Sequence, residues 1–163
     1  MNGMVWVRIL VGVVWLNGAV EKLLNPEFPQ QFATSLQAGG FISAAPPFFQ
    51  DFMRGVVVPN VELFAQLMRA GELALGVALI LGLFTNLAAL GSVGLSIVIV
   101  LSQGGVRLGA GLGAPEFITI NVLVALISIV ILLSSAAKAY SVDAILARRR
   151  PSLSPLLTNR RAS

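Results

Sequence analysis

The chain has 163 residues, of which 56% are hydrophobic and 11% are charged, and its formal net charge is +4. A soluble domain carries about 25% charged residues, so this composition excludes an ordinary soluble domain. The chain has no Cys and no His. It therefore excludes disulfides and thiol chemistry, and it lacks the usual ligands of haem, iron–sulfur, copper and zinc sites. We predict no metal and no covalently bound cofactor.

Four apolar stretches follow one another along the chain, at about residues 4–24, 61–84, 87–103 and 117–138. A helix needs about 17–25 residues to cross the hydrocarbon core of a bilayer, and each stretch falls in that range. The first stretch contains Arg8 and has no basic segment before it, so we expect a span rather than a cleaved signal peptide. The sequence therefore predicts an all-α, polytopic membrane protein, a bundle of four transmembrane helices.

The segment between the first and second spans, residues 25–60, is a long outward loop with six phenylalanines and five prolines. Pro26 and Pro47 each precede a run of apolar residues at helical spacing. Proline is favoured in a first helical turn, and this spacing is typical of amphipathic helices. We expect short interfacial helices that lie at the outer membrane surface. The alternative is a docking surface for a partner.

The other two connections differ sharply in length. Only Thr85 and Asn86 separate the second span from the third, so these two helices must be antiparallel neighbours. Residues 104–115 form a second outward loop that is rich in Gly but lacks the Gly-Lys-Ser/Thr ending of a phosphate-binding loop. We therefore predict no phosphate site there.

The C-terminal segment is basic, since five of the eleven Lys and Arg residues lie in the last sixteen positions. Beside a membrane span, such residues usually mark the cytoplasmic side. We therefore predict both termini in the cytoplasm and no nucleic-acid binding. The predicted organisation is a transmembrane domain, residues 1–146, followed by a basic cytoplasmic tail, residues 147–163.

Charged and polar residues recur inside the predicted spans, where a central Arg or Asp costs about 2.5–3.5 kcal/mol. At about 100° per residue they form two helical stripes. The stripes consist of Glu62, Gln66, Arg69, Glu72 and Gly76 in the second span and of Arg8, Gly12, Trp15, Ala19 and Lys22 in the first. The small residues among them are expected to allow close helix approach.

The predicted topology brings several polar residues into the outer half of the membrane. They are Lys22 and Glu62 near the surface, Asn17 and Arg69 about 10–12 Å below it, Glu72 near the middle, and Glu116 and Asn121 on the fourth span. We therefore predict one outward-facing polar pocket.

Two interpretations of this cluster remain open. In the first, Glu62–Lys22 and Arg69–Glu72 are ion pairs that fix helix register. In the second, the cluster binds the polar head of a quinone or a small anion. The residues proposed for that site are Arg69 and Glu72, with Glu62, Lys22 and Asn17 in support and Trp15 as an apolar wall. Desolvation offsets much of the attraction in a buried ion pair, and intramembrane charges often mark functional sites.

Other polar residues of the spans have simpler interpretations. We expect the long side chain of Arg8, near the inner surface, to snorkel to water. Ser92 and Ser96 lie one helical turn apart and are expected to bond to their own helix or a neighbour. Without His, a Ser–His–carboxylate triad is impossible.

Three stretches of the sequence resemble the DoxX/DoxD family of small bacterial membrane proteins with four helices. The first runs from Arg8-Ile9-Leu10-Val11-Gly12 through Trp15-Leu16-Asn17-Gly18 to Glu21-Lys22-Leu23, the second joins Glu72-Leu73-Ala74-Leu75-Gly76 to Leu81-Gly82-Leu83-Phe84-Thr85, and the third is Ala139-Tyr140-Ser141-Val142-Asp143. The first stretch is more similar to the DoxD branch, the small subunit of thiosulfate:quinone oxidoreductase.

The resemblance implies a helical bundle in the bacterial cytoplasmic membrane that works beside an oxidoreductase and delivers electrons to quinone. Our first hypothesis is accordingly a membrane subunit of a respiratory or redox complex that contacts quinone, surrounded by lipids and other subunits. The second is a non-catalytic subunit that stabilises a larger assembly, and the third is a small transporter. Catalysis by this chain alone is not expected.

Overall fold

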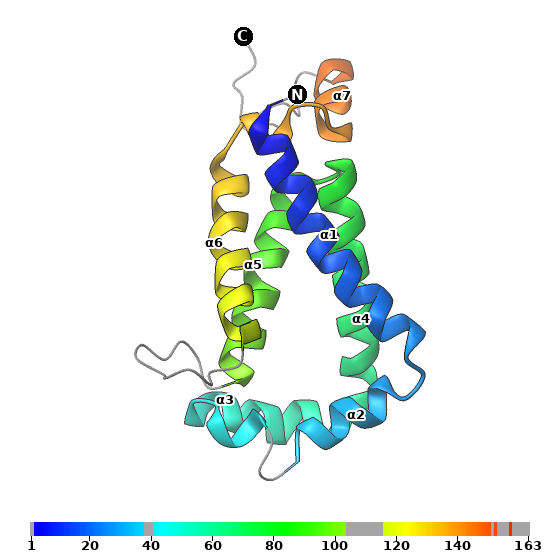
Figure 1. Ribbon diagram of the computed structural model, residues 1–163, viewed down its shortest axis with the longest axis vertical. Helices are drawn as coiled ribbons and strands as arrows, with labels where there is room; N and C mark the ends of the chain where they lie inside the picture. Colours follow the sequence, from blue (N-terminus) through cyan, green and yellow to red (C-terminus); the bar gives the residue numbers. More distant parts are fainter. Residues whose placement is uncertain (1, 38–40, 104–115, 151, 153–156, 158–163) are drawn as a thin grey trace.

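The structure, a computed structural model, describes residues 2–37, 41–103, 116–150, 152 and 157. Four long helices lie side by side along the molecule: α1 (Gly3–Leu24), α4 (Val61–Leu81), α5 (Thr85–Ser102) and α6 (Glu116–Leu133). The start of α1 and the short helix α7 (Val142–Arg149) lie at one end, and α2 (Phe28–Ser35) and α3 (Pro47–Phe52) lie across the other (Figure 1). We call these the α7 end and the α2–α3 end.

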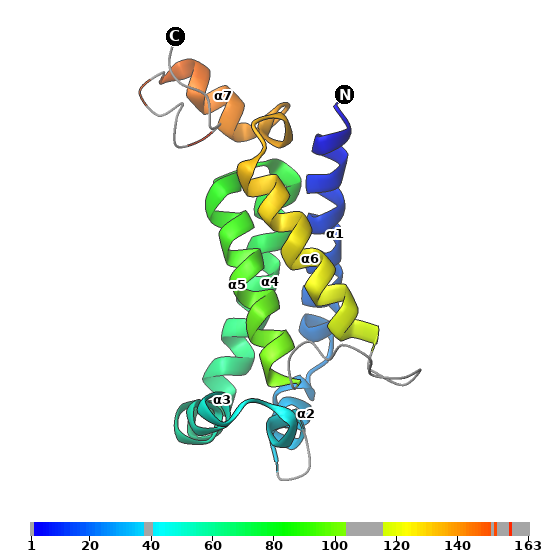
Figure 2. The same ribbon diagram turned by 90° about the vertical axis from the view of Figure 1, so that its left-hand side faces the viewer.

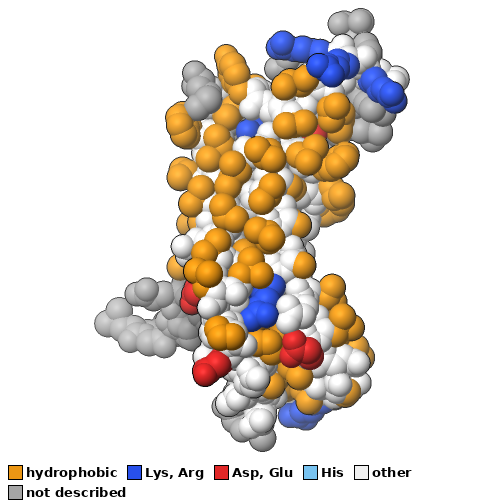
Figure 3. Space-filling view, turned by 90° about the vertical axis from the view of Figure 1, so that its right-hand side faces the viewer, with side chains coloured by type: hydrophobic (Ala, Val, Ile, Leu, Met, Phe, Trp, Pro, Cys, Tyr) orange, Lys and Arg blue, Asp and Glu red, His pale blue; other side chains and the backbone are white. Residues whose placement is uncertain are grey.

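The predicted all-α class is confirmed for the described residues, which contain no strand. Three described segments are long and apolar enough to cross a membrane: Gly3–Leu24, Pro47–Leu81 and Thr85–Ser102. In α6 the described apolar segment is shorter, Ile120–Leu133, and the count of four spans stays a prediction. Figure 3 shows hydrophobic side chains over the middle of one face and charged side chains gathered toward its two ends.

The helix ends differ from the predicted limits where the backbone turns. α4 ends at Leu81, before the predicted Phe84, because Gly82 adopts the left-handed conformation with φ 66°. Phe84 is also left-handed, with φ 47°, and α5 begins directly after it. α6 ends at Leu133, and the predicted fourth span continues past it into a 3₁₀ helix, η4 (Ala136–Lys138).

The long helices form two closely packed pairs, since α1 packs mainly against α4 and α5 mainly against α6. Glycines allow the close approach of α1 and α4, as predicted. A Cβ on Gly76 would lie 2.8 Å from the backbone nitrogen of Leu16, and one on Gly12 would lie 2.9 Å from that of Ile80. A real Cβ does not come so close to backbone, so these two positions require glycine.

The segment between α1 and α4 is largely helical and crosses the bundle at one end (Figure 2). α3 begins with Pro47, as predicted. α2 begins at Phe28, and the proline of its first turn is Pro29 rather than the predicted Pro26. After α3 the chain continues through a π-helix, η2 (Met53–Val57), and a 3₁₀ turn, η3 (Val58–Asn60), into α4. Buried residues tie the segment together: Leu36, Ile42, Ala45, Phe49, Met53 and Val57. Its position at a membrane surface stays a prediction.

At the α7 end, four buried polar side chains join the helices: Arg8, Lys138, Ser141 and Asp143. We call them the terminal cluster. Asp143 accepts hydrogen bonds from the backbone N–H groups of Phe84 (2.8 Å) and Thr85 (2.7 Å). The N-cap residue of α5, Phe84, offers no capping side chain. A carboxylate from α7 therefore satisfies the first N–H groups of α5.

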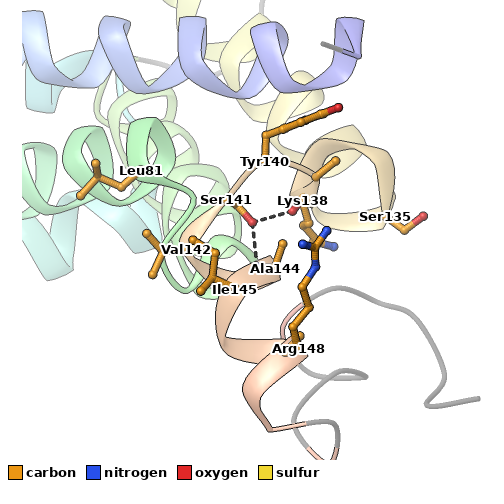
Figure 4. Close-up of a pocket in the computed structure, with 11 residues that line it drawn as sticks. Leu81, Ser135, Lys138, Tyr140, Ser141, Val142, Ala144, Ile145 and Arg148 are labelled. Atoms are coloured by element: carbon orange, nitrogen blue, oxygen red, sulfur yellow. Dashed lines mark hydrogen bonds between the residues drawn. The ribbon is translucent and has the colours of Figure 1, made fainter.

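Ser141 and Lys138 complete the junction between α6 and α7. The Ser141 hydroxyl donates to the carbonyl of Lys138 (2.5 Å) and accepts from the N–H of Ala144 (3.0 Å), so it caps α7 (Figure 4). Lys138 Nζ donates to the carbonyl of Leu132 (2.8 Å), near the end of α6. The predicted boundary between residues 146 and 147 falls inside α7.

The prediction that Arg8 snorkels to water is wrong, because its side chain is only 1% exposed. Its guanidinium donates to the carbonyl oxygens of Ala137 (2.8 Å) and Tyr140 (3.4 Å). Carbonyls at the end of a helix lack partners within the helix, and a guanidinium can satisfy several of them. Arg8 therefore joins α1 to the segment that follows α6.

We predict that Gly76→Ala lowers the free energy of unfolding by about 1–3 kcal/mol, since the new methyl group must push α1 away from α4. The matched control is Gly94→Ala in α5, where an added Cβ meets nothing within 4 Å. That change should be neutral or stabilising by up to about 1 kcal/mol. Thermal unfolding in a mild detergent measures both, and equal melting temperatures would contradict the close contact.

We also predict that Asp143→Asn destabilises the fold by about 3 kcal/mol, because it removes the buried charge facing Arg8 and Lys138. The amide NH₂ would in addition face the N–H groups that begin α5. The control is Asp51→Asn, an exposed position on α3, with an expected effect within about 0.5 kcal/mol. The same unfolding measurement applies, and a stable Asp143→Asn variant would show that the cap is dispensable.

Candidate functional site

A cavity of about 680 Å³ lies between the two helix pairs near the α2–α3 end. α1, α4, α5 and α6 form its sides, and α2, α3 and η2 contribute to its lining. Most of the wall is apolar. The lining includes Trp15, Phe32, Met53, Met68, Leu95 and Val124, which come from six different elements. The cavity therefore exists only when the whole bundle is assembled.

An ion pair between Lys22 and Glu72 lies in the wall of this cavity. Lys22 Nζ is 2.9 Å from Glu72 Oε2 and also donates to the carbonyl of Gly18 (3.3 Å). Glu72 is 3% exposed. A buried carboxylate needs a partner, and the lysine supplies both an opposite charge and a hydrogen bond.

Gly18 makes room for this pair. A Cβ at this position would lie 2.9 Å from Glu72 Oε2 and 3.5 Å from Lys22 Nζ. The glycine therefore does more than allow helix packing: it leaves space on α1 for the carboxylate of α4.

The predicted ion pairs Glu62–Lys22 and Arg69–Glu72 are wrong, because the lysine pairs with the deeper carboxylate. Lys22 reaches back along α1 toward Gly18 and so meets Glu72. Glu62 instead accepts a hydrogen bond from Gln66 (2.7 Å) on its own helix.

Arg69 holds the turn between α1 and α2. Its guanidinium donates to the carbonyl of Asn25 (2.6 Å) and to Gln66 Oε1 (3.3 Å), and it lies 5.2 Å from the centre of the Phe28 ring. Arg69 does not line the cavity, whereas Asn25 and Phe28 do. The arginine thus contributes to the cavity by positioning two of the residues in its wall.

The six residues proposed from the sequence therefore separate into two groups. Trp15, Lys22 and Glu72 line the cavity, and Arg69, Glu62 and Asn17 do not. Glu62 and Asn17 are exposed on their helices. Asn121, which the sequence placed in the same half, does line the cavity.

A chain of hydrogen bonds links Trp15 to the other helix pair. The indole N–H of Trp15 donates to Ser92 Oγ (2.7 Å), which lies 2.7 Å from Ser128 Oγ. The expectation that Ser92 bonds to its own helix or a neighbour is thus confirmed. The same expectation for Ser96 is wrong, because its buried hydroxyl has no hydrogen-bond partner among the described residues. Sequence analysis missed Ser128 and Gly18. Ser128 lies in a uniformly apolar stretch, and only its polarity within that stretch could have signalled its role.

The chemistry of the cavity suits an amphipathic ligand. Its volume falls within the range of about 300–1,000 Å³ typical of small-molecule sites, which are mostly apolar with a few polar groups. The described residues contain no group of three acidic side chains that could hold a metal ion. The arrangement can bind a polar head at Lys22 and Glu72 and an apolar body against the aromatic wall.

Comparison with protein families matches residues 4–157 to a family described as the TQO small subunit DoxD. The comparison with curated proteins and that with solved structures each returned no match. The matched residues include every residue that lines the cavity and all four members of the terminal cluster. Since the match extends over nearly the whole sequence, the chain belongs to the DoxD family.

Proposed function

We propose that this protein is a membrane subunit of a quinone-linked redox complex and that the cavity binds the quinone. The family description supports a subunit role, since it names a small subunit. The observation that carries the quinone proposal is the Lys22–Glu72 pair in the wall of a largely apolar cavity. The quinone would supply the redox chemistry, while the protein orients it and tunes its electrostatics.

Lys22 is the hydrogen-bond donor to the quinone head in this proposal. An ammonium group carries three N–H donors. Among the described residues, Lys22 Nζ donates to Glu72 and Gly18, so one donor remains for a quinone carbonyl. Glu72 would hold the lysine in place beside the cavity.

The apolar walls would hold the ring and the first part of its tail. Trp15 is fixed by its hydrogen bond to Ser92, and Phe28 by its contact with Arg69. Aromatic rings held in this way offer flat surfaces for stacking without a loss of side-chain freedom on binding. Arg69 is a positioning residue in this proposal.

The second candidate is a structural subunit that stabilises a larger assembly. It is favoured by the contacts of Arg69, which join α4 to the α1–α2 turn within the chain. In that case the Lys22–Glu72 pair would fix helix register, and the cavity would hold lipid.

We further propose four spans with both termini in the cytoplasm of a bacterial cell. The exposed arginines of α7 support this orientation, because Lys and Arg collect on cytoplasmic flanks. The α2–α3 end and the cavity would then face outward.

Orientation is checked with reporter fusions to the full chain. A fluorescent protein that matures only in the cytoplasm should be bright after residue 163 and dark when inserted within residues 104–115. A bright insertion would place that loop inside and overturn the proposed topology.

Two variants test the quinone site in the complex purified from native membranes. Glu72→Gln keeps the shape but leaves Lys22 without its counter-charge, so quinone-coupled turnover should fall at least about tenfold. Gly71 lines the cavity, and a Cβ there meets nothing within 4 Å. Gly71→Leu should therefore fill the cavity and abolish copurified quinone without disturbing the helices.

The matched controls are Glu62→Gln, an exposed carboxylate on the same helix, and Gly94→Leu, an open position outside the cavity. Both should retain quinone and turnover. If Gly71→Leu kept full quinone content, the cavity would not be the site. If Glu72→Gln lowered assembly or thermal stability but not turnover per intact complex, the protein would be a structural subunit.

A further inference from the structure

The two ends of the molecule carry different charges. Among the described acidic side chains, only Asp143 belongs to the α7 end, and it is fully buried. The other acidic side chains that the structure describes belong to the last turn of α1, the α2–α3 segment or the part of α4 near the cavity: Glu21, Glu27, Asp51, Glu62 and Glu72. In contrast, Arg148, Arg149 and Arg150 are all exposed at the end of α7. The surface of the α7 end is therefore cationic.

A groove of about 750 Å³ opens on this surface between the end of α4, η4 and α7. Leu81, Val142 and Ile145 form an apolar wall on one side, and Ser135, Lys138 and Arg148 lie on the other (Figure 4). Leu81 is 49% exposed and Ile145 55% exposed. The groove thus joins an apolar strip, next to the end of a membrane-spanning helix, to the exposed cation Arg148.

Arg148 is the accessible cation of the groove. Its guanidinium extends from α7 toward η4 (Figure 4), and it makes no hydrogen bond or ion pair with any described residue. Lys138 is buried beside it and donates one hydrogen bond to Leu132. Arg148 is therefore the exposed cation that faces the groove, and the one described carboxylate nearby, Asp143, is engaged with the backbone of α5.

We propose that this groove binds an anionic phospholipid, with its phosphate on Arg148 and the start of its acyl chain against Leu81, Val142 and Ile145. A soluble anion would need the arginine but not the apolar wall. A neutral lipid would need the apolar wall but not the arginine. The groove combines both at the end of a spanning helix, where the headgroup layer of a bilayer lies.

The fork of Arg148 suits a phosphate because guanidinium donors bind phosphate oxygens in pairs. The half-buried Ser135, which also lines the groove, carries a hydroxyl that can donate to glycerol or ester oxygens. The lipid would join α4 to α7 and so support the terminal cluster from outside.

The test uses the full-length chain purified in mild detergent and titrated with phosphatidylglycerol or phosphatidylcholine. Lipid binding is counted by native mass spectrometry, and the rise in melting temperature is followed in parallel, because a ligand of the folded state raises stability. Phosphatidylglycerol should bind more tightly than phosphatidylcholine. Arg148→Gln should weaken phosphatidylglycerol binding about fivefold, the effect of one basic group near an anionic headgroup.

The matched control is Arg149→Gln, a neighbouring exposed arginine that does not line the groove. It should change the affinity less than twofold. A second pair tests the apolar wall: Ile145→Asn should weaken binding, and Leu146→Asn, outside the groove, should not. Neither pair touches the cavity at the other end, so quinone content is expected to stay unchanged.

Three results would overturn the proposal. Equal binding of the two lipids would show that the charge of Arg148 plays no part in binding. Equal losses in Arg148→Gln and Arg149→Gln would indicate diffuse attraction to α7 rather than a groove. Competition by inorganic phosphate at the lipid's own affinity would indicate a site for a soluble anion.

Discussion

The close contact of α1 with α4 sets most of the geometry in this protein. Gly12 and Gly76 bring the two backbones together at the middle of the pair. Because helices are stiff, this contact also fixes what meets on either side of it. Toward the α2–α3 end, Gly18 leaves room for Glu72. Toward the α7 end, a Cβ on Gly82 would lie 2.6 Å from the guanidinium of Arg8. Glycines along this contact therefore leave room for the Lys22–Glu72 pair at one end and for Arg8 of the terminal cluster at the other.

The terminal cluster and the Lys22–Glu72 pair both bury charged side chains, but their partners differ. In the terminal cluster the charged groups bond to the backbone: Arg8 donates to carbonyl oxygens, and Asp143 accepts from N–H groups. It therefore closes the bundle and leaves little for a ligand. Lys22 and Glu72 bond mainly to each other, and the pair lies in the wall of the cavity. Chemistry is therefore expected at the α2–α3 end, and structural support at the other.

Sequence patterns predicted the long helices, the short helix that begins at Pro47, and the gathering of Trp15, Lys22 and Glu72. It could not predict which charges pair, because a lysine side chain spans more than one helical turn and its direction depends on the neighbouring helix. For this reason the sequence did not reveal that Lys22 pairs with Glu72, which lies deeper than Glu62. The burial of Arg8 was missed because its partners are carbonyls that follow α6, far away in the sequence.

The family signature in the sequence mixes these two roles. Arg8, Gly82, Ser141 and Asp143 all lie in resembling stretches, yet they hold the α7 end together. Gly18, Lys22 and Glu72 lie in resembling stretches too, and they form the wall of the cavity. Gly76 and Gly18 illustrate the difference between helix packing and the cavity wall. A Cβ on Gly76 would strike backbone, whereas one on Gly18 would strike only the carboxylate of Glu72. Helix packing alone therefore requires glycine at position 76, but at position 18 the requirement comes from the ion pair in the cavity wall.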